Sequence, residues 1–267
     1  MVDKLISSLR AHNLDDEIVQ DSLISVNTIF ENLPGHVSHG IAVQSYLPKK
    51  SFRKTIDLDV DIFYGGGYKA YREIFQPMKE SLISKGYEID SKKIRSTFDH
   101  FISKNGDSYI IQFPRRSKNN FEKKRKKSLE REISNQQLIS RNGITYPVIS
   151  PEDLVHHKLS RVSNFVESFG VKVPDYLSRE DFKEKAEEMR AIVTYSILDT
   201  NEKLKKKVRE ETMFQFRVLC DCYDVKALSE FIGLDKNYLY EAISSWENPE
   251  KEKKMYDLMD KLRIEAN

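Results

Sequence analysis

Apolar and acidic side chains alternate strictly between residues 56 and 62, which read Ile-Asp-Leu-Asp-Val-Asp-Ile. Successive side chains of a strand point to opposite faces, so this pattern predicts a strand whose apolar residues face a core. The other face then carries Asp57, Asp59 and Asp61. Like charges this close together repel one another unless a cation lies among them. We therefore expect this face either to lie open to water or to bind a metal ion.

Further periodic segments surround this strand in the first 150 residues. Helical spacing of apolar residues predicts helices at residues 2–12, 14–32, 40–47 and 68–86. Strand-like runs occur at 94–103, 108–113, 128–133 and 144–149, with Asn105-Gly106-Asp107 as a hairpin turn between the first two. The glycines at 65–67 follow the acidic strand but lack the Lys-Ser/Thr of a P-loop, so they predict a turn. Together these elements predict a mixed or mostly antiparallel sheet flanked by helices.

The character of the chain changes at Ser150. Ser150-Pro151-Glu152-Asp153 is a typical helix start, with Ser as N-cap, Pro at the first position and acids in the first turn. Nearly all that follows predicts helix, at 151–164, 179–198, 202–226, 227–233, 236–246 and 249–264. The expected fold class is therefore α+β, with a mixed-sheet domain at 1–150 and an all-helical domain at 151–267.

Composition limits the possible functions only weakly. The 267 residues include 44 Lys and Arg against 42 Asp and Glu, a formal net charge of +2, so any nucleic-acid surface must be local. No run of about 18 apolar residues predicts a membrane-spanning helix, and the first residues lack the apolar core of a signal peptide. The two cysteines, Cys220 and Cys222, are too close together for an ordinary disulfide and lack a second pair of metal ligands. We expect a reduced, cytoplasmic protein without a membrane partner.

The acidic strand can support metal chemistry. Carboxylates two residues apart on a strand can share a hard cation, and Mg²⁺ (or Mn²⁺) is held by one or two carboxylates together with substrate phosphates. A helix that begins at Ser38-His39-Gly40 precedes the strand, and amides at a helix N-terminus can hold phosphate. The alternative is a solvated strand face with no ligand.

This order of residues resembles that of the polymerase-beta-like nucleotidyltransferase superfamily, in which a Gly-Gly or Gly-Ser helix start is followed by Asp-x-Asp. The likeness is greatest to the AbiEii-type toxins of type IV toxin–antitoxin systems, which read G-G-x-A-[LV] and then R-x-[ST]-x-D-[IL]-D. The chain has His39-Gly-Ile-Ala-Val43 and Arg53-Lys-Thr-Ile-Asp-Leu-Asp59 in that order.

The resemblance implies roles for these residues. Asp57 and Asp59 would be the catalytic metal ligands, with Asp61 accessory or simply exposed. The nucleotide would be bound by His39, Gly40, Arg53 and Thr55, together with Lys158 of a second signature.

Two signatures of the same branch follow in the helical half. Pro151-Glu-Asp-Leu-Val-His-His-Lys158-Leu159 is similar to P-x-[ED]-[LI]-x-x-x-K-L, and Cys220-Asp221-Cys222-Tyr223-Asp224 is similar to an Asp-x-x-Asp helix. The resemblance implies that Lys158 contacts the triphosphate and that Asp221 acts as a base or orients Lys158, so that residues 151–267 complete the nucleotide cleft. The alternative is that both are ordinary exposed helix residues.

Three positions depart from the family pattern. His39 stands where the first glycine is expected, Cys220 replaces a basic residue, and Gln112 occupies the inward position at which a third acid is usual on a following strand. Gln112 cannot supply a carboxylate's charge. We expect weakened catalysis or a changed metal count.

A basic segment, Arg115–Arg131, has nine Lys or Arg among its seventeen residues. Such clusters bind nucleic-acid backbones through salt-sensitive contacts, and Phe121 could stack on a base. The alternative is a solvated loop. The residues assigned to RNA binding are Arg115, Arg116, Lys123, Lys124, Arg125, Lys126 and Lys127.

The sequence thus predicts a Mg²⁺-dependent nucleotidyltransferase that transfers a nucleotide from an NTP to an acceptor hydroxyl, with RNA, and transfer RNA in particular, as the expected acceptor. If the protein is a toxin, an antitoxin protein is its expected partner. One alternative is a catalytically degenerate module of the same fold that binds RNA or a protein. Another is adenylylation of a protein acceptor.

Overall fold

A computed structural model describes residues 10–94, 96–174, 177–198, 202–245 and 248–266. The chain divides into two compact units, Met1–Ser150 and Pro151–Asn267. The helix predicted at 2–12 lies largely outside the described residues, and its last residue, His12, forms an isolated bridge with Thr55.

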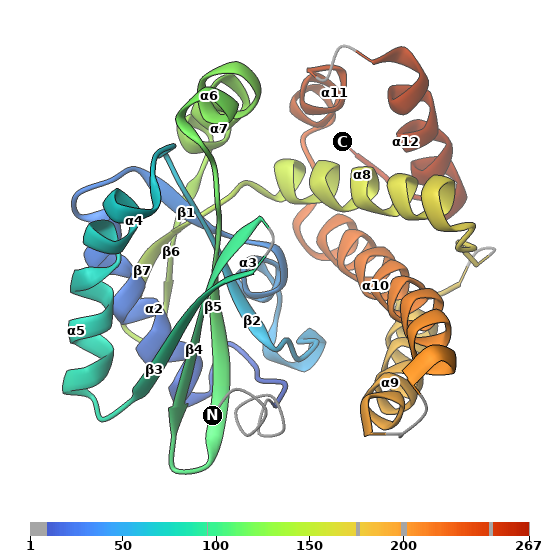
Figure 1. Ribbon diagram of the computed structural model, residues 1–267. Helices are drawn as coiled ribbons and strands as arrows, with labels where there is room; N and C mark the ends of the chain where they lie inside the picture. Colours follow the sequence, from blue (N-terminus) through green and yellow to red (C-terminus); the bar gives the residue numbers. More distant parts are fainter. Residues whose placement is uncertain (1–9, 95, 175–176, 199–201, 246–247, 267) are drawn as a thin grey trace. The chain divides into compact units, whose positions relative to one another are not determined.

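A seven-stranded sheet organises the described part of the first unit, in the order β3-β4-β5-β2-β1-β7-β6 (Figure 1). Two pairs, β2/β5 and β1/β7, are parallel, and the other pairs are antiparallel, so the sheet is mixed as predicted. The strands are β1 (Gly35–Ser38), β2 (Asp57–Ile62), β3 (Glu88–Ile94), β4 (Thr97–Lys104), β5 (Asp107–Pro114), β6 (Gln137–Arg141) and β7 (Ile144–Val148).

Helices α2 and α5 pack against each other and lie to one side of this sheet (Figure 1). The alternation of β2 places Leu58, Val60 and Ile62 in the core, where all three are fully buried. Burial of such side chains contributes roughly 1.5–3 kcal/mol each. The helices of this unit are α2 (Glu17–Phe30), α3 (His39–Tyr46), α4 (Tyr68–Ile74), α5 (Gln76–Ser84), the short α6 (Lys118–Asn120) and α7 (Lys126–Ser134).

Several elements of the first unit differ from the sequence prediction. Residues 128–133, predicted as a strand, belong to helix α7, because Leu129 and Glu132 are buried at helical spacing. The helix predicted at 68–86 is two helices, with Pro77 at the start of α5. Strands β3 and β6 were not predicted, because both are edge strands with mostly exposed or half-buried side chains, so neither has a buried face to mark it.

The second unit is helical throughout its described elements. Helix α8 packs against α10, α11 and α12, and α9 packs against α10. Their bounds are α8 (Pro151–Phe169), α9 (Arg179–Leu198), α10 (Glu202–Ile232), α11 (Lys236–Ser244) and α12 (Pro249–Leu262). Cys220 and Cys222 are buried and unoxidised on α10, a single helix where the sequence predicted two. No described helix combines the length and the apolar character that crossing a bilayer requires.

Candidate active site

Of the three carboxylates on the polar face of β2, two remain accessible. Asp57 and Asp59 are half-buried, whereas Asp61 is only 4% exposed. The guanidinium of Arg116 donates to Asp61 Oδ1, and Arg125 Nη2 lies 3.9 Å from Oδ2. Burial alone would raise the pKa of Asp61, but these two guanidinium groups hold it well below its ordinary value. Asp61 is therefore neither exposed nor a third site carboxylate. Arg116 and Arg125 compensate the charge of Asp61.

The start of α3 lies beside Asp59. Strands β1 and β2 pair Ser38 with Asp59, and α3 begins at the next residue, His39. The backbone of His39 has φ 55°, in the left-handed region that favours glycine. The position at which the resembled family has glycine therefore has a glycine-like backbone in this chain as well.

The side chain of Thr55 lies between Gly40 and Asp57 and is close to both. The hydroxyl of Thr55 donates to Asp57 Oδ1 at 2.7 Å. A Cβ on Gly40 would lie 3.0 Å from that hydroxyl oxygen, so a side chain there would push against the residue that orients Asp57. The fourth residue predicted to bind nucleotide, Arg53, is half-buried, and its carbonyl accepts from Gln44 Nε2 at 2.8 Å. Thr55 thus links the start of α3 to Asp57, one of the two accessible carboxylates.

The donor set fits a single hard divalent cation. No group of three or more His, Cys, Asp or Glu side chains suited to a metal ion occurs among the described residues. Asp57 and Asp59 alone provide the one or two carboxylates that Mg²⁺ uses when phosphates and water complete its shell. Gln112 of β5 is in register with Asp59, as expected for the inward position. Sequence reasoning did not identify Asp99 of β4, which is in register with Gln112 and accepts a hydrogen bond from it.

In the helical unit, Lys158 is neither a surface residue nor a free cation. It is 1% exposed, and its ammonium donates to Asp224 Oδ2 at 2.7 Å and to Asp221 Oδ1 at 3.1 Å. Arg161 donates to both oxygens of Asp221, at 2.6 and 2.7 Å. Burial would raise the pKa of Asp221, but Arg161 and Lys158 hold it well below its ordinary value. The network contains two carboxylates and two cations.

Sequence reasoning assigned no role to two members of this network, Asp224 and Arg161. A signal was present, because each lies three residues beyond a residue that was identified, and residues three apart lie on the same helix face.

The basic segment is partly built into the fold. Arg116 is buried against Asp61. Nη1 and Nη2 of Arg125 each donate at 2.5 Å to a carboxylate oxygen of buried Glu132. Phe121, at the start of a π-helical turn (η2, Phe121–Arg125), is buried, and its ring meets that of Phe63 edge-on at 5.1 Å. Arg116 and Phe121 are therefore too buried to form an exposed RNA surface, contrary to the sequence prediction, and half-buried Arg125 is engaged by a buried carboxylate.

Other basic residues of the segment remain at the surface. Arg115, Lys118, Lys123 and Lys127 are exposed, and Lys126 is half-buried with its ammonium 3.1 Å from Glu122. The side chain of Lys124 lies outside the described residues.

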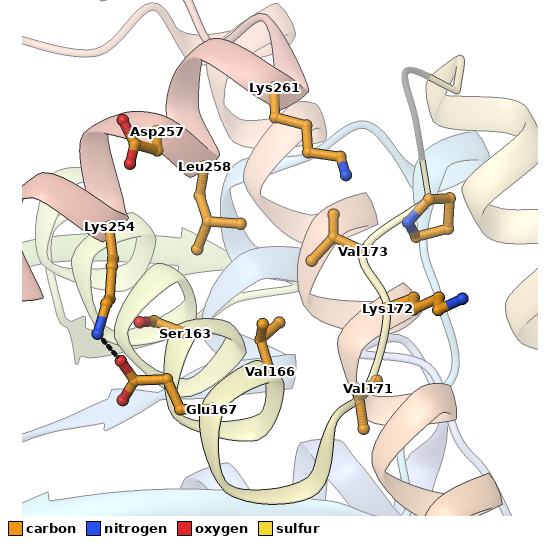
Figure 2. A pocket seen from close by; sticks show the side chains of 11 residues that line it. Ser163, Val166, Glu167, Val171, Lys172, Val173, Lys254, Asp257, Leu258 and Lys261 are labelled. Carbon is orange, nitrogen blue, oxygen red and sulfur yellow. Dashed lines mark hydrogen bonds and ion pairs between the residues drawn. The ribbon is translucent and has the colours of Figure 1, made fainter.

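A cavity of about 600 Å³ lies within the helical unit (Figure 2). Its apolar wall includes Val166, Val171, Val173 and Leu258, while a pair formed by Lys254 and Glu167 lies at its edge. Among the described residues that line this cavity, none is a site residue predicted from the sequence.

No protein-family model and no curated protein matches the chain. Among solved structures, the chain is similar to that of an antigenic nucleotidyltransferase-like protein from Paracoccidioides brasiliensis, with a TM-score of 0.50 and 11% sequence identity over 97% of each chain. At this identity the likeness concerns the fold alone. The mixed sheet with its flanking helices, followed by a helical unit, is accordingly a nucleotidyltransferase-like fold.

Proposed function

We propose that the protein is a Mg²⁺-dependent nucleotidyltransferase that transfers a nucleotide from an NTP to an acceptor hydroxyl. The observation that carries this proposal is the juxtaposition of two accessible carboxylates, Asp57 and Asp59, with the N-terminus of α3. The nucleotidyltransferase-like fold supports it.

The residues of the first unit would bind and orient the NTP. Backbone amides at His39 and Gly40 would receive phosphate oxygens, because the first amides of a helix lack intrahelical partners and carry the positive end of its dipole. Asp57 and Asp59 would hold Mg²⁺, which neutralises phosphate charge when bound. Thr55 would fix the orientation of Asp57.

The transfer exchanges one bond to the α-phosphorus for another. The acceptor oxygen forms a bond to that phosphorus, the bond to the pyrophosphate oxygen breaks, and the hydroxyl proton passes to solvent. Asp221 is a poor candidate for a base, because Arg161 and Lys158 lower its pKa and already donate to both of its carboxylate oxygens, which weakens its affinity for a proton. We therefore assign Asp221 and Asp224 to holding Lys158 and Arg161 in place.

RNA, with transfer RNA first, is the acceptor class we propose. The exposed basic residues Arg115, Lys118, Lys123 and Lys127 support it, because such charges bind phosphate backbones independently of sequence. A role as an AbiEii-type toxin restrained by an antitoxin rests on the sequence resemblance.

The test is a labelling screen with each α-³²P-NTP, Mg²⁺, total RNA and total protein. We expect wild-type protein to label RNA and the Asp57→Asn/Asp59→Asn variant to show at least a hundredfold loss. Asp90→Asn, which removes a half-buried carboxylate from β3, is the matched control and should label like wild type. Label on a protein acceptor would instead indicate adenylylation.

A second candidate is a catalytically degenerate binding module. The observations that favour it are the imidazole at His39, the neutral Gln112 and the enclosed ammonium of Lys158. In that case no nucleotide would label any acceptor, and Mg²⁺-NTP would leave the thermal unfolding midpoint of the folded protein unchanged. A shift with Mg²⁺-NTP that disappears in Asp59→Asn would support the enzyme.

A further inference from the structure

Polar side chains form a row across three neighbouring strands at the candidate site. Asp59 of β2 is in register with Gln112 of β5, and Gln112 is in register with Asp99 of β4. Residues in register on adjacent strands point to the same face of a sheet. Asp99, Gln112 and Asp59 therefore share the face that also carries Asp57.

The carboxylate of Asp99 fixes the orientation of the Gln112 amide. Gln112 Nε2 donates to Asp99 Oδ1 at 3.0 Å, and Asp99 is buried. An ionised carboxylate only accepts hydrogen bonds, so the NH₂ end of the amide must face it. The carbonyl end, Oε1, is the other branch of the same planar group and is directed away from Asp99. This fixed oxygen belongs to the residue in register with Asp59.

We propose that Gln112 presents its amide oxygen as a neutral third ligand to a divalent cation held by Asp57 and Asp59, with Asp99 as the positioning residue. Hard cations accept carboxylates and the side-chain carbonyls of Asn and Gln alike. Two carboxylates and one neutral oxygen give a ligand charge that matches a single divalent ion. The inference rests on the proposed function for Asp57 and Asp59, and it gives Gln112 a role instead of marking the site as degenerate.

The test measures metal binding directly, without nucleotide or turnover. Mn²⁺ serves as the probe, with free ion followed by electron paramagnetic resonance and heat by calorimetry. We expect Gln112→Leu, which keeps the side-chain size and removes the oxygen, to weaken Mn²⁺ binding about tenfold. Asp99→Leu should weaken it by a similar factor, since losing the group that orients a ligand typically costs about 10–100-fold.

Three controls keep the outcomes distinct. Asp90→Asn removes a carboxylate from β3 and should bind Mn²⁺ like wild type, and circular dichroism verifies that each variant is folded. If Gln112→Leu binds like wild type while Asp59→Asn loses Mn²⁺, Gln112 is no ligand and this inference is overturned, but the proposed carboxylate pair stands. If Asp59→Asn also binds like wild type, or wild type binds no Mn²⁺, the metal site of the proposed function is overturned as well. Should Asp99→Leu not fold, the Mn²⁺ affinity of Gln112→Leu still decides the outcome.

Discussion

The backbone of His39 is the most unusual single-residue feature of the candidate site. Its left-handed conformation costs a residue with a Cβ about 1 kcal/mol relative to glycine. We expect His39→Gly to be more stable than His39→Ala by about this amount, as measured by urea unfolding. Both variants lose the imidazole, so their difference reports the backbone alone. Equal stabilities would contradict the assignment of strain to this position.

The alternation of residues 56–62 marked Asp57, Asp59 and Asp61 alike, and only the family resemblance ranked the first two above Asp61. All three share the same alternation and the same chemistry. They differ because Arg116, 55 positions later in the chain than Asp61, lies against Asp61 alone. A contact between such distant residues leaves no local pattern. The same holds for the pairing of Gln112 with Asp99, whose partnership depends on the register of β4 against β5.

At the scale of elements, the pair formed by Asp61 and Arg116 joins β2 to the basic segment. Replacing one member of a buried ion pair leaves the other without charge compensation, at a cost of about 3 kcal/mol. We expect Asp61→Asn to lower the free energy of unfolding by about that amount. Asp57→Asn, on the same face but half-buried, should lower it by less than about 1 kcal/mol. Comparable losses for both variants in chemical unfolding would refute the distinction between the two carboxylates.

Strand β4 carries a pH dependence through His100. Burial lowers the pKa of His100 to about 3, whereas in the unfolded chain it is near 6.5. The unfolded state therefore binds the extra proton first, and stability falls as pH decreases from about 6.5 toward 3. For this residue we expect a loss of about 2 kcal/mol between pH 7 and pH 5.

The measurement is urea unfolding of wild type and of His100→Gln at both pH values. His100→Gln keeps a polar group for Ser91, which lies 2.8 Å from His100 Nδ1, and should show a shallower pH dependence. Parallel curves for the two proteins would mean that His100 does not bear the proton difference.

The elements that the sequence predicted well are those marked by a local pattern of residues. The alternation of β2, the hairpin turn between β4 and β5, and the Ser-Pro-Glu-Asp start of α8 all have a local physical cause. Helix α7 was mistaken for a strand because Leu129 and Ile133 also fit a period of two over so short a run. Its buried Glu132, which pairs with Arg125, could not be told from a surface acid.

At the scale of the whole molecule, the boundary at Ser150 was visible because periodicity changes there from mixed to purely helical. Each unit has its own core, around β2 in the first and between α8 and α10 in the second. The fold is similar to that of a solved structure with which the chain is 11% identical in sequence. Fold at this level follows from the arrangement of apolar faces, whereas function depends on a few polar residues that such a comparison does not test.

The close approach of Gly65 to the basic segment has a practical consequence. A Cβ on Gly65 would lie 2.2 Å from Cβ of Phe121, and the neighbouring Gly66 donates its amide to the carbonyl of Arg116 at 3.0 Å. The basic segment thus packs directly against the glycines that follow the acidic strand. Gly65→Ala adds one methyl group, which should displace Phe121 and the basic segment while every charge in the protein stays the same. The position of the basic segment can therefore be changed without changing its charge, whereas substitution of its lysines changes both.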